Sequence, residues 1–235
     1  MSKFIKKIVN LYKHIFPENI FFSKLKFFLY WEYGFIRFYF YYFFFGLKKY
    51  SQIDQNTKGV DYSRNQFFSE GSPRYKPDFR IFHSFFLLNS IPELNKESIL
   101  ILGPRYETEI LLAKAFKFQT INALDTFSYS PLIETGDIHK MPYKDLKFQN
   151  IVCSYTFSYS VNPLLFSHEL NRVLKKDGFL IISVQRLDPK ESSVDGLLKI
   201  KDRVQSKESF DNFFPNLQNF CYIESKNHIL IGYKK

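Results

Sequence analysis

Two aspartates in the second half of the chain are placed to bind an adenosine. Asp125 follows a short apolar run about 20 residues after Gly103, the spacing at which a carboxylate accepts hydrogen bonds from both hydroxyls of an adenosine ribose. Asp137 is placed to accept a hydrogen bond from the adenine amine, and the backbone amide of Ile138 to donate one to a ring nitrogen. The alternative for each aspartate is a turn or a helix cap. The pair predicts a nucleoside site.

These residues follow short apolar segments that alternate with helical ones. Residues 108–118 (TEILLAKAFKF) and 163–175 have helical length, and Pro163 suits a first helical turn. Five other runs are predicted as strands: residues 98–102, 120–124, 132–135, 150–154 and 179–184. Residues 98–102 (SILIL) have the continuous apolar character of a strand buried on both faces of a parallel sheet.

The last two predicted strands follow a different pattern. Residues 220–225 and 228–233 are joined by Lys226 and Asn227, a two-residue connection suited to a hairpin. Short strands alternating with helices imply right-handed crossovers. The sequence therefore predicts an α/β domain over residues 93–235, with a mostly parallel sheet, helices on both faces and a C-terminal antiparallel hairpin.

Such a sheet binds ligands beyond the carboxyl ends of its strands, where strand order reverses. Four predicted loops lie there. They comprise residues 103–107, 125–127, 136–139 and 154–157.

Three consecutive segments resemble class I S-adenosylmethionine-dependent methyltransferases of the methyltransferase type 11-like group. Residues 136–143 (GDIHKMPY) resemble the family's Gly-Asp pair and Pro-aromatic turn, and residues 148–154 (FQNIVCS) the strand after it. Residues 168–178 (HELNRVLKKDG) resemble the family's Glu-x-x-Arg-Val-Leu-Lys-Pro-Gly-Gly helix and turn. The resemblance covers about residues 97–235. It implies a Rossmann-like seven-stranded sheet, the cofactor S-adenosyl-L-methionine, and methyl transfer.

The resemblance also implies which residues hold the cofactor. Asp125 takes the ribose, Asp137 and Ile138 the adenine, and the loop after the first strand the methionine end. The full predicted set is Gly103, Pro104, Arg105, Glu107, Asp125, Thr126, Asp137, Ile138 and Ser154.

The first loop departs from the family's Asp-x-Gly-x-Gly-x-Gly pattern. Ile101 stands at the acidic position, and Arg105 and Glu107 replace the later glycines. Bulky side chains here disfavour a pyrophosphate against the helix N-terminus, and with it an NAD-type cofactor. Arg105 would instead meet the methionine carboxylate, and Glu107 or Glu109 its cationic groups. The alternative is a loop that no longer binds cofactor.

This Gly-Pro-Arg-x-Glu-x-Glu loop looks like that of methyltransferase-like proteins associated with surface-polysaccharide or glycan pathways. That resemblance implies a small-molecule, glycan or lipid-linked acceptor. A non-catalytic scaffold or binding protein with the same fold is the alternative.

Methyl transfer to an activated acceptor needs positioning and exclusion of water, and it needs a base only when the acceptor must lose a proton. His139 is the nearest candidate base, with capping or packing as its alternative role. Tyr155, Phe157 and Tyr159 are predicted to line the acceptor pocket, with aromatic packing as the alternative for at least one of them. The spacing of His and Cys predicts no metal site.

The N-terminal segment is basic and aromatic. Residues 1–50, here called the aromatic arm, precede a polar connector and a predicted packing helix within residues 51–92. Residues 27–47 approach the length of a membrane span but include Glu32 and Arg37. We therefore expect a helical arm that either lies on an anionic membrane surface or caps the site, with a true span as the third alternative.

Charge and cysteine content bear on partners and compartment. The formal net charge is +10, which favours anionic partners, although AT-biased coding also produces Lys-rich sequences. No nucleic-acid module is recognised, which disfavours nucleic acid as the partner. Cys153 and Cys221 read as small buried hydrophobes, and no secretory signal pattern is evident. The expected location is cytoplasmic or peripheral to the inner face of the membrane.

Overall fold

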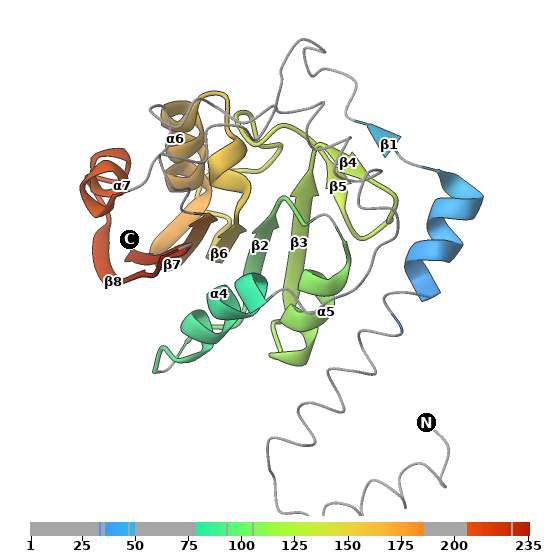
Figure 1. Cartoon of the computed structure of the whole chain (residues 1–235), viewed down its shortest axis with the longest axis horizontal. Coiled ribbons are helices and arrows are strands. Elements are labelled where there is room, and N and C mark those ends of the chain that lie inside the picture. The colour runs from blue at the N-terminus through green and yellow to red at the C-terminus, as the bar shows by residue number, and fades with distance from the viewer. Residues whose placement is uncertain are drawn as a thin grey trace, which may run out of the picture.

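The computed structural model describes residues 33, 36–46, 48–49, 79–92, 94–104, 106–185, 206–226 and 228–235. Arg105, residues 1–32 and residues 50–78 lie outside this description, so the predictions that fall on them are not taken further. Figure 1 shows the sheet with its helices and the helical residues 36–45 beside it.

The core of the molecule is one seven-stranded sheet in the order β5-β3-β2-β6-β7-β9-β8. The pairs from β5 to β7 are parallel, and β9 runs antiparallel to both β7 and β8. This confirms the predicted Rossmann-like sheet and its antiparallel C-terminal hairpin. The strands span Ser98–Leu102 (β2), Thr120–Asp125 (β3), Glu134–Thr135 (β5), Phe148–Ser154 (β6), Leu174–Gln185 (β7), Gln218–Glu224 (β8) and His228–Lys234 (β9).

Helices cover both faces of this sheet because its central strands are apolar on both sides. In β2, Ile99 and Ile101 face a cluster shared with α4 (Phe79–Asn89) and α5 (Thr108–Ala115). Leu100 and Leu102 of β2 face the opposite cluster, shared with α6 (Pro163–Val173) and α7 (Lys207–Phe213). A continuous apolar run is what a strand buried on both faces requires.

Local sequence signals fix the starts of α6 and α7. The Asn162 side chain accepts a hydrogen bond from the Leu165 amide at 3.0 Å, and Pro163 occupies the first turn of α6. Ser206 caps α7 in the same way by accepting from the Ser209 amide at 3.1 Å. Both helices therefore begin where side-chain oxygens satisfy amides that the helix leaves unbonded.

The end of α6 differs from the prediction. The helix stops at Val173, two residues early, because Leu174 pairs with Phe148 and already belongs to β7. Asp177 then adopts φ 59°, and the register shifts between Phe148 and Asn150. This irregularity, rather than a simple turn at 177–178, leads into the central part of the strand.

The connection between β3 and β5 is short and pairs with the aromatic arm. It contains β4 (Phe127–Ser128), which pairs antiparallel with β1 (Lys48–Lys49) of the arm. The parallel strands β3 and β5 are thus joined without a crossover helix in the described residues 126–133. The described part of the arm is tied to the domain at this edge.

Two further predictions concern a membrane span in the aromatic arm and the burial of the two cysteines. Among the helices that the structure describes, none has both the length and the apolar character needed to cross a bilayer.

Cys153 is buried and Cys221 is partly exposed, and both are free thiols. Burial raises the pKa of both thiols, as expected for packing residues rather than reactive ones.

Candidate functional site

The turn after β2 requires a glycine. Gly103 has φ +68°, in the left-handed region, and a Cβ there would lie 1.9 Å from Oγ1 of Thr156. The Thr156 hydroxyl donates to the Leu102 carbonyl at 2.8 Å, and the Gly103 amide donates to the Leu124 carbonyl at 2.9 Å. The first loop is therefore held against the loop after β6 and against the end of β3.

Glu107, predicted to meet the methionine end of the cofactor, is engaged inside the protein. Its side chain is fully buried and accepts hydrogen bonds from Nε and Nη2 of Arg37 at 2.5 and 2.9 Å. Oγ of Ser130 also donates to it, and the Glu107 amide is bonded to the Tyr129 hydroxyl. The hydrogen bonds to Glu107 raise the pKa of Arg37 above its already high value. The pair is a fork-to-carboxylate contact that neutralises a buried charge.

The two aspartates of the predicted nucleoside site lie at neighbouring strand ends. Asp125 is paired with Thr135 across β3 and β5, and its carbonyl accepts from the Gly136 amide at 2.9 Å. A Cβ at Gly136 would come within 2.6 Å of Leu124 Cδ1, so the absence of a side chain lets the two strand ends approach. Asp137 follows directly. Both carboxylates thus belong to one edge of the sheet.

Asp137 is held by its own loop. Its Oδ1 accepts from the backbone amide of His139 and contacts Nδ1 of the same ring, each at 2.8 Å. Oδ2 accepts no hydrogen bond from the part of the chain that the structure describes, and the carboxylate side chain is 35% exposed. The Ile138 amide likewise makes no hydrogen bond to the described residues. One acceptor and one donor therefore remain for a ligand.

Both ring nitrogens of His139 are engaged. Nε2 lies 2.8 Å from Oγ of the fully buried Ser160, while Nδ1 faces Asp137. The imidazole also packs edge-on against the Phe166 ring, with centroids 6.0 Å apart. This chain of Asp137, His139 and Ser160 joins the loop after β5 to the loop after β6. These contacts suit the capping or packing role that the sequence left as the alternative for His139, and they hold the Asp137 loop in position.

His139→Ala is expected to lower the free energy of unfolding by about 2 kcal/mol, because it removes two side-chain hydrogen bonds and leaves the buried Ser160 hydroxyl without its partner. Urea unfolding followed by circular dichroism measures this. Ser160→Ala, which removes one bond of the same chain, is the matched variant and should cost about half as much. Equal stability of His139→Ala and the wild type would contradict the positioning role.

The residues predicted to line the acceptor pocket separate into two groups. Phe157 is 1% exposed and stacks on Phe166 at 5.4 Å, so its ring packs in the core, the alternative that the sequence left open. Tyr155, with φ 65°, places its hydroxyl 2.9 Å from Nδ1 of His228. Tyr159 is partly exposed at the end of η1 (Thr156–Tyr159). Tyr155 and Tyr159 remain the candidates for acceptor contact.

The remaining cofactor candidates have varied surroundings. Thr126 is partly exposed beside Asp125, and Pro104 is buried beside Gly103. Ser154 is 6% exposed, and its Oγ donates to Ser84 of α4 at 3.3 Å. The structure thus brings the predicted loops to one edge of the sheet, but it turns the Ser154 hydroxyl toward α4.

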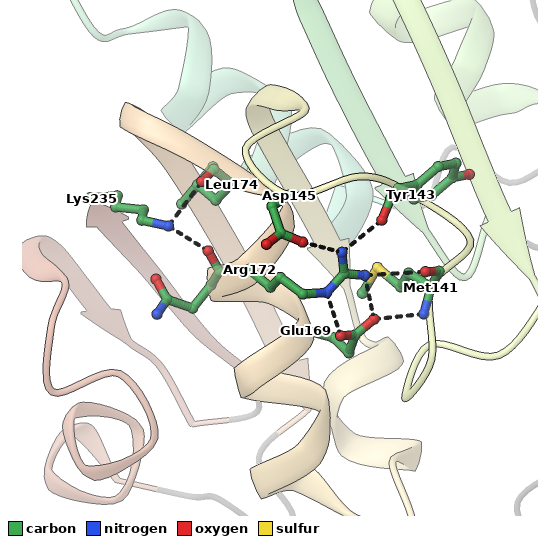
Figure 2. Close-up of polar contacts among 8 residues, drawn as sticks. Met141, Tyr143, Asp145, Glu169, Arg172, Leu174 and Lys235 are labelled. Atoms are coloured by element: carbon green, nitrogen blue, oxygen red, sulfur yellow. Dashed lines mark hydrogen bonds and ion pairs between the residues drawn. The ribbon is translucent and has the colours of Figure 1, made fainter.

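A clamp that the sequence motif contained, but that was not predicted as functional, holds the loop after Asp137. Arg172 and Glu169 of α6 form it with Met141, Tyr143 and Asp145, and Figure 2 shows these contacts. Arg172 donates to the carbonyls of Tyr143 and Met141 at 2.6 and 3.1 Å and to Glu169 at 2.6 and 2.8 Å. Glu169 in turn accepts from the Met141 amide at 2.7 Å. The Glu-x-x-Arg spacing at i and i+3 was the available signal.

Comparison with known proteins agrees with this geometry. A family model described as a methyltransferase domain matches residues 112–182. No curated protein matches the sequence. A solved S-adenosylmethionine-dependent methyltransferase from Aquifex aeolicus is 17% identical, covering 72% of this chain and 97% of its own, with a TM-score of 0.52.

Two further solved structures are similar. A 1,6-didemethyltoxoflavin-N1-methyltransferase from Burkholderia thailandensis, with bound S-adenosylhomocysteine, is 8% identical over 80% of this chain and 94% of its own, with a TM-score of 0.56. The [4+2]-cyclase SpnF is 11% identical over 78% and 95%, with a TM-score of 0.57. The domain therefore has the class I methyltransferase fold, and the resemblance to class I S-adenosylmethionine-dependent methyltransferases is confirmed.

Proposed function

We propose that this chain transfers a methyl group from S-adenosyl-L-methionine to a small-molecule, glycan or lipid-linked acceptor. The observation that carries the proposal is the placement of Asp125 and Asp137 at adjacent strand ends, joined through the Asp125–Thr135 pair and the 2.9 Å bond from the Gly136 amide. A ribose and an adenine are the two ends of one adenosine, and this edge offers a carboxylate for each.

The residues present fit the adenosine part of the cofactor. Asp125 would accept from the ribose hydroxyls beside Thr126, while Oδ2 of Asp137 and the amide of Ile138 would meet the adenine edge. The lack of hydrogen bonds from described residues to these two adenine-facing groups supports this assignment.

The methionine end fits in a modified form. Glu107 is committed to Arg37 and Ser130, so we assign it to supporting the loop rather than to direct contact. Gly103 and Pro104 would approach the methionine part. When bound, the cofactor supplies an electrophilic sulfonium methyl, and the chain has to position the acceptor and exclude water.

The proposed acceptor class rests on the resemblance of the first loop to that of glycan-pathway proteins. Because both nitrogens of His139 are engaged, we assign it to holding the Asp137 loop. Tyr155 and Tyr159 would flank the acceptor. The likeness of the first loop to glycan-pathway proteins supports a role in surface-polysaccharide biosynthesis, in the cytoplasm or at the inner face of the membrane.

Isothermal titration with S-adenosylmethionine and S-adenosylhomocysteine tests this function. Asp125→Ala is expected to raise the dissociation constant by about 100-fold, because two charge-assisted hydrogen bonds are lost. Asp177→Asn is the matched control, since the Asp177 side chain is 84% exposed within β7 and Nζ of Lys234, its ion-pair partner, is 3.7 Å away. It should bind as the wild type does. The absence of binding for both ligands by the wild type would end the enzyme hypothesis.

A non-catalytic scaffold is the second candidate. It is favoured by the engagement of Glu107 with Arg37, which occupies a carboxylate of the first loop. The fold alone does not fix the reaction, as the similar cyclase structure illustrates. Cofactor binding that depends on Asp125 would count against the scaffold. A folded protein with no affinity for either ligand would favour it.

A further inference from the structure

The helical residues 36–45 of the aromatic arm present two different faces. One face is fixed to the domain: Phe38 is 5% exposed and packs against Tyr106 and Tyr129, with ring centroids 5.5 and 4.7 Å away. Arg37 forms the ion pair with Glu107 on the same side. The segment is therefore held in one orientation beside the first loop (Figure 1).

The other face is a stripe of exposed apolar side chains. Ile36, Phe40, Phe43 and Phe44 are 65%, 52%, 82% and 64% exposed. Their positions i, i+4, i+7 and i+8 place them on one side of a helix. We call this set the aromatic face. Exposed rings gathered in this way are typical of an interaction surface rather than of scattered surface residues.

The charge around this face favours an anionic occupant. Residues 36–49 contain no Asp or Glu, and Lys48 and Lys49 lie three and four positions after the last helical residue. The whole arm, residues 1–50, has nine Lys and Arg residues against two Glu. Basic residues flanking a ring-rich helix face suit the boundary between anionic headgroups and acyl chains.

We propose that the aromatic face docks side-on to an anionic phospholipid surface. Because the opposite face holds the first loop through Arg37 and Phe38, docking would set the candidate site beside the bilayer. The inference thereby deepens the proposed function, since it favours a lipid-linked acceptor among the three classes. It rests on that function only for the identity of the acceptor.

Flotation of the full chain with vesicles tests the docking surface. The wild type is expected to float with vesicles of equal parts phosphatidylglycerol and phosphatidylcholine, and less with phosphatidylcholine alone or at high salt. The triple variant Phe40→Gln, Phe43→Gln, Phe44→Gln should lower the partition coefficient by about 100-fold, because three rings no longer leave water. Gln keeps helix propensity close to that of good helix formers.

The matched control removes three exposed apolar side chains elsewhere. Val161, Leu164 and Leu165 near the start of α6 are 49%, 56% and 45% exposed, and Val161→Gln, Leu164→Gln, Leu165→Gln should float as the wild type does. Circular dichroism confirms that both variants fold. The proposal is overturned if the aromatic-face variant floats as well as the wild type does, or if the wild type does not float.

Two further readouts separate the remaining outcomes. If light scattering shows a wild-type dimer that the aromatic-face variant converts to monomer, with no vesicle binding, the occupant is a second copy and the lipid assignment is wrong. Titration with S-adenosylhomocysteine reports on the proposed function separately. If the protein floats with vesicles but does not bind cofactor, the proposed methyl transfer is wrong and the lipid-docking proposal stands. If it binds cofactor but does not float, the lipid-docking proposal is wrong and the proposed methyl transfer stands.

Discussion

Gly103→Ala is expected to lower the free energy of unfolding by about 3 kcal/mol. The glycine has φ +68°, where a side chain is strained, and the new Cβ would fall 1.9 Å from Thr156 Oγ1 and 2.9 Å from its Cβ and Cγ2. Relief would require moving Thr156, whose hydroxyl is bonded to the Leu102 carbonyl. Urea unfolding measures the loss, and titration with S-adenosylhomocysteine should show weaker binding because the first loop is displaced.

Gly46 separates the two causes. It has almost the same φ, +66°, but nothing lies within 4 Å of a Cβ built there. Gly46→Ala should therefore cost only the conformational part, about 1 kcal/mol. Adding Thr156→Ala to Gly103→Ala should restore part of the lost stability, since it removes the nearest clashing atom. An equal cost for the two glycine substitutions would show that the contact with Thr156 carries no weight.

Arg172→Ala is expected to destabilise the fold by about 3 kcal/mol, because it breaks the clamp that joins α6 to residues 141–146. The guanidinium donates to two carbonyls and two carboxylates, and the Glu169 side chain that it pairs with is only 14% exposed. The substitution would leave the largely buried carboxylate of Glu169 without the guanidinium that pairs with it. Urea unfolding measures the effect, and weaker cofactor binding should accompany it because the clamped loop follows directly after Asp137.

Two variants bracket this result. Arg172→Lys keeps the charge but not the planar fork, so it should recover only part of the stability. Lys175→Ala removes a more exposed pair, with Glu97 at 3.1 Å and side-chain exposures of 31% and 57%, and should cost less than about 0.5 kcal/mol. If the free energies of unfolding of Arg172→Ala and Lys175→Ala agree within error, the clamp does not stabilise the loop.

The sheet was predictable because its strands carry a strong local signal. Continuous apolar runs such as residues 98–102 and 150–154 can only be buried on both faces, and the Lys226-Asn227 connection indicates a hairpin. The neighbourhood of Asp125 and Asp137 follows from the same pattern, since Asp125 ends β3, Asp137 lies two residues after β5, and these strands pair in parallel. Residue order alone was sufficient to predict that these two residues lie at neighbouring strand ends.

What could not be predicted depends on contacts between distant residues. Arg37 lies 70 positions from Glu107 in the sequence, and no local pattern links them. β1 and β4 have two residues each, too few for a periodicity to appear. The burial of Phe157 depends on how η1 turns its ring toward α6 and α7, which is decided by packing after the strand ends.

A crystal structure of the protein with S-adenosylhomocysteine tests the central claim most directly. We expect the ribose hydroxyls to lie within hydrogen-bonding distance of the Asp125 carboxylate. We expect the adenine amine to donate to Asp137 and an adenine ring nitrogen to accept from the amide of Ile138. Density for the nucleoside at any other edge of the sheet, with these three groups facing solvent, would contradict the assignment.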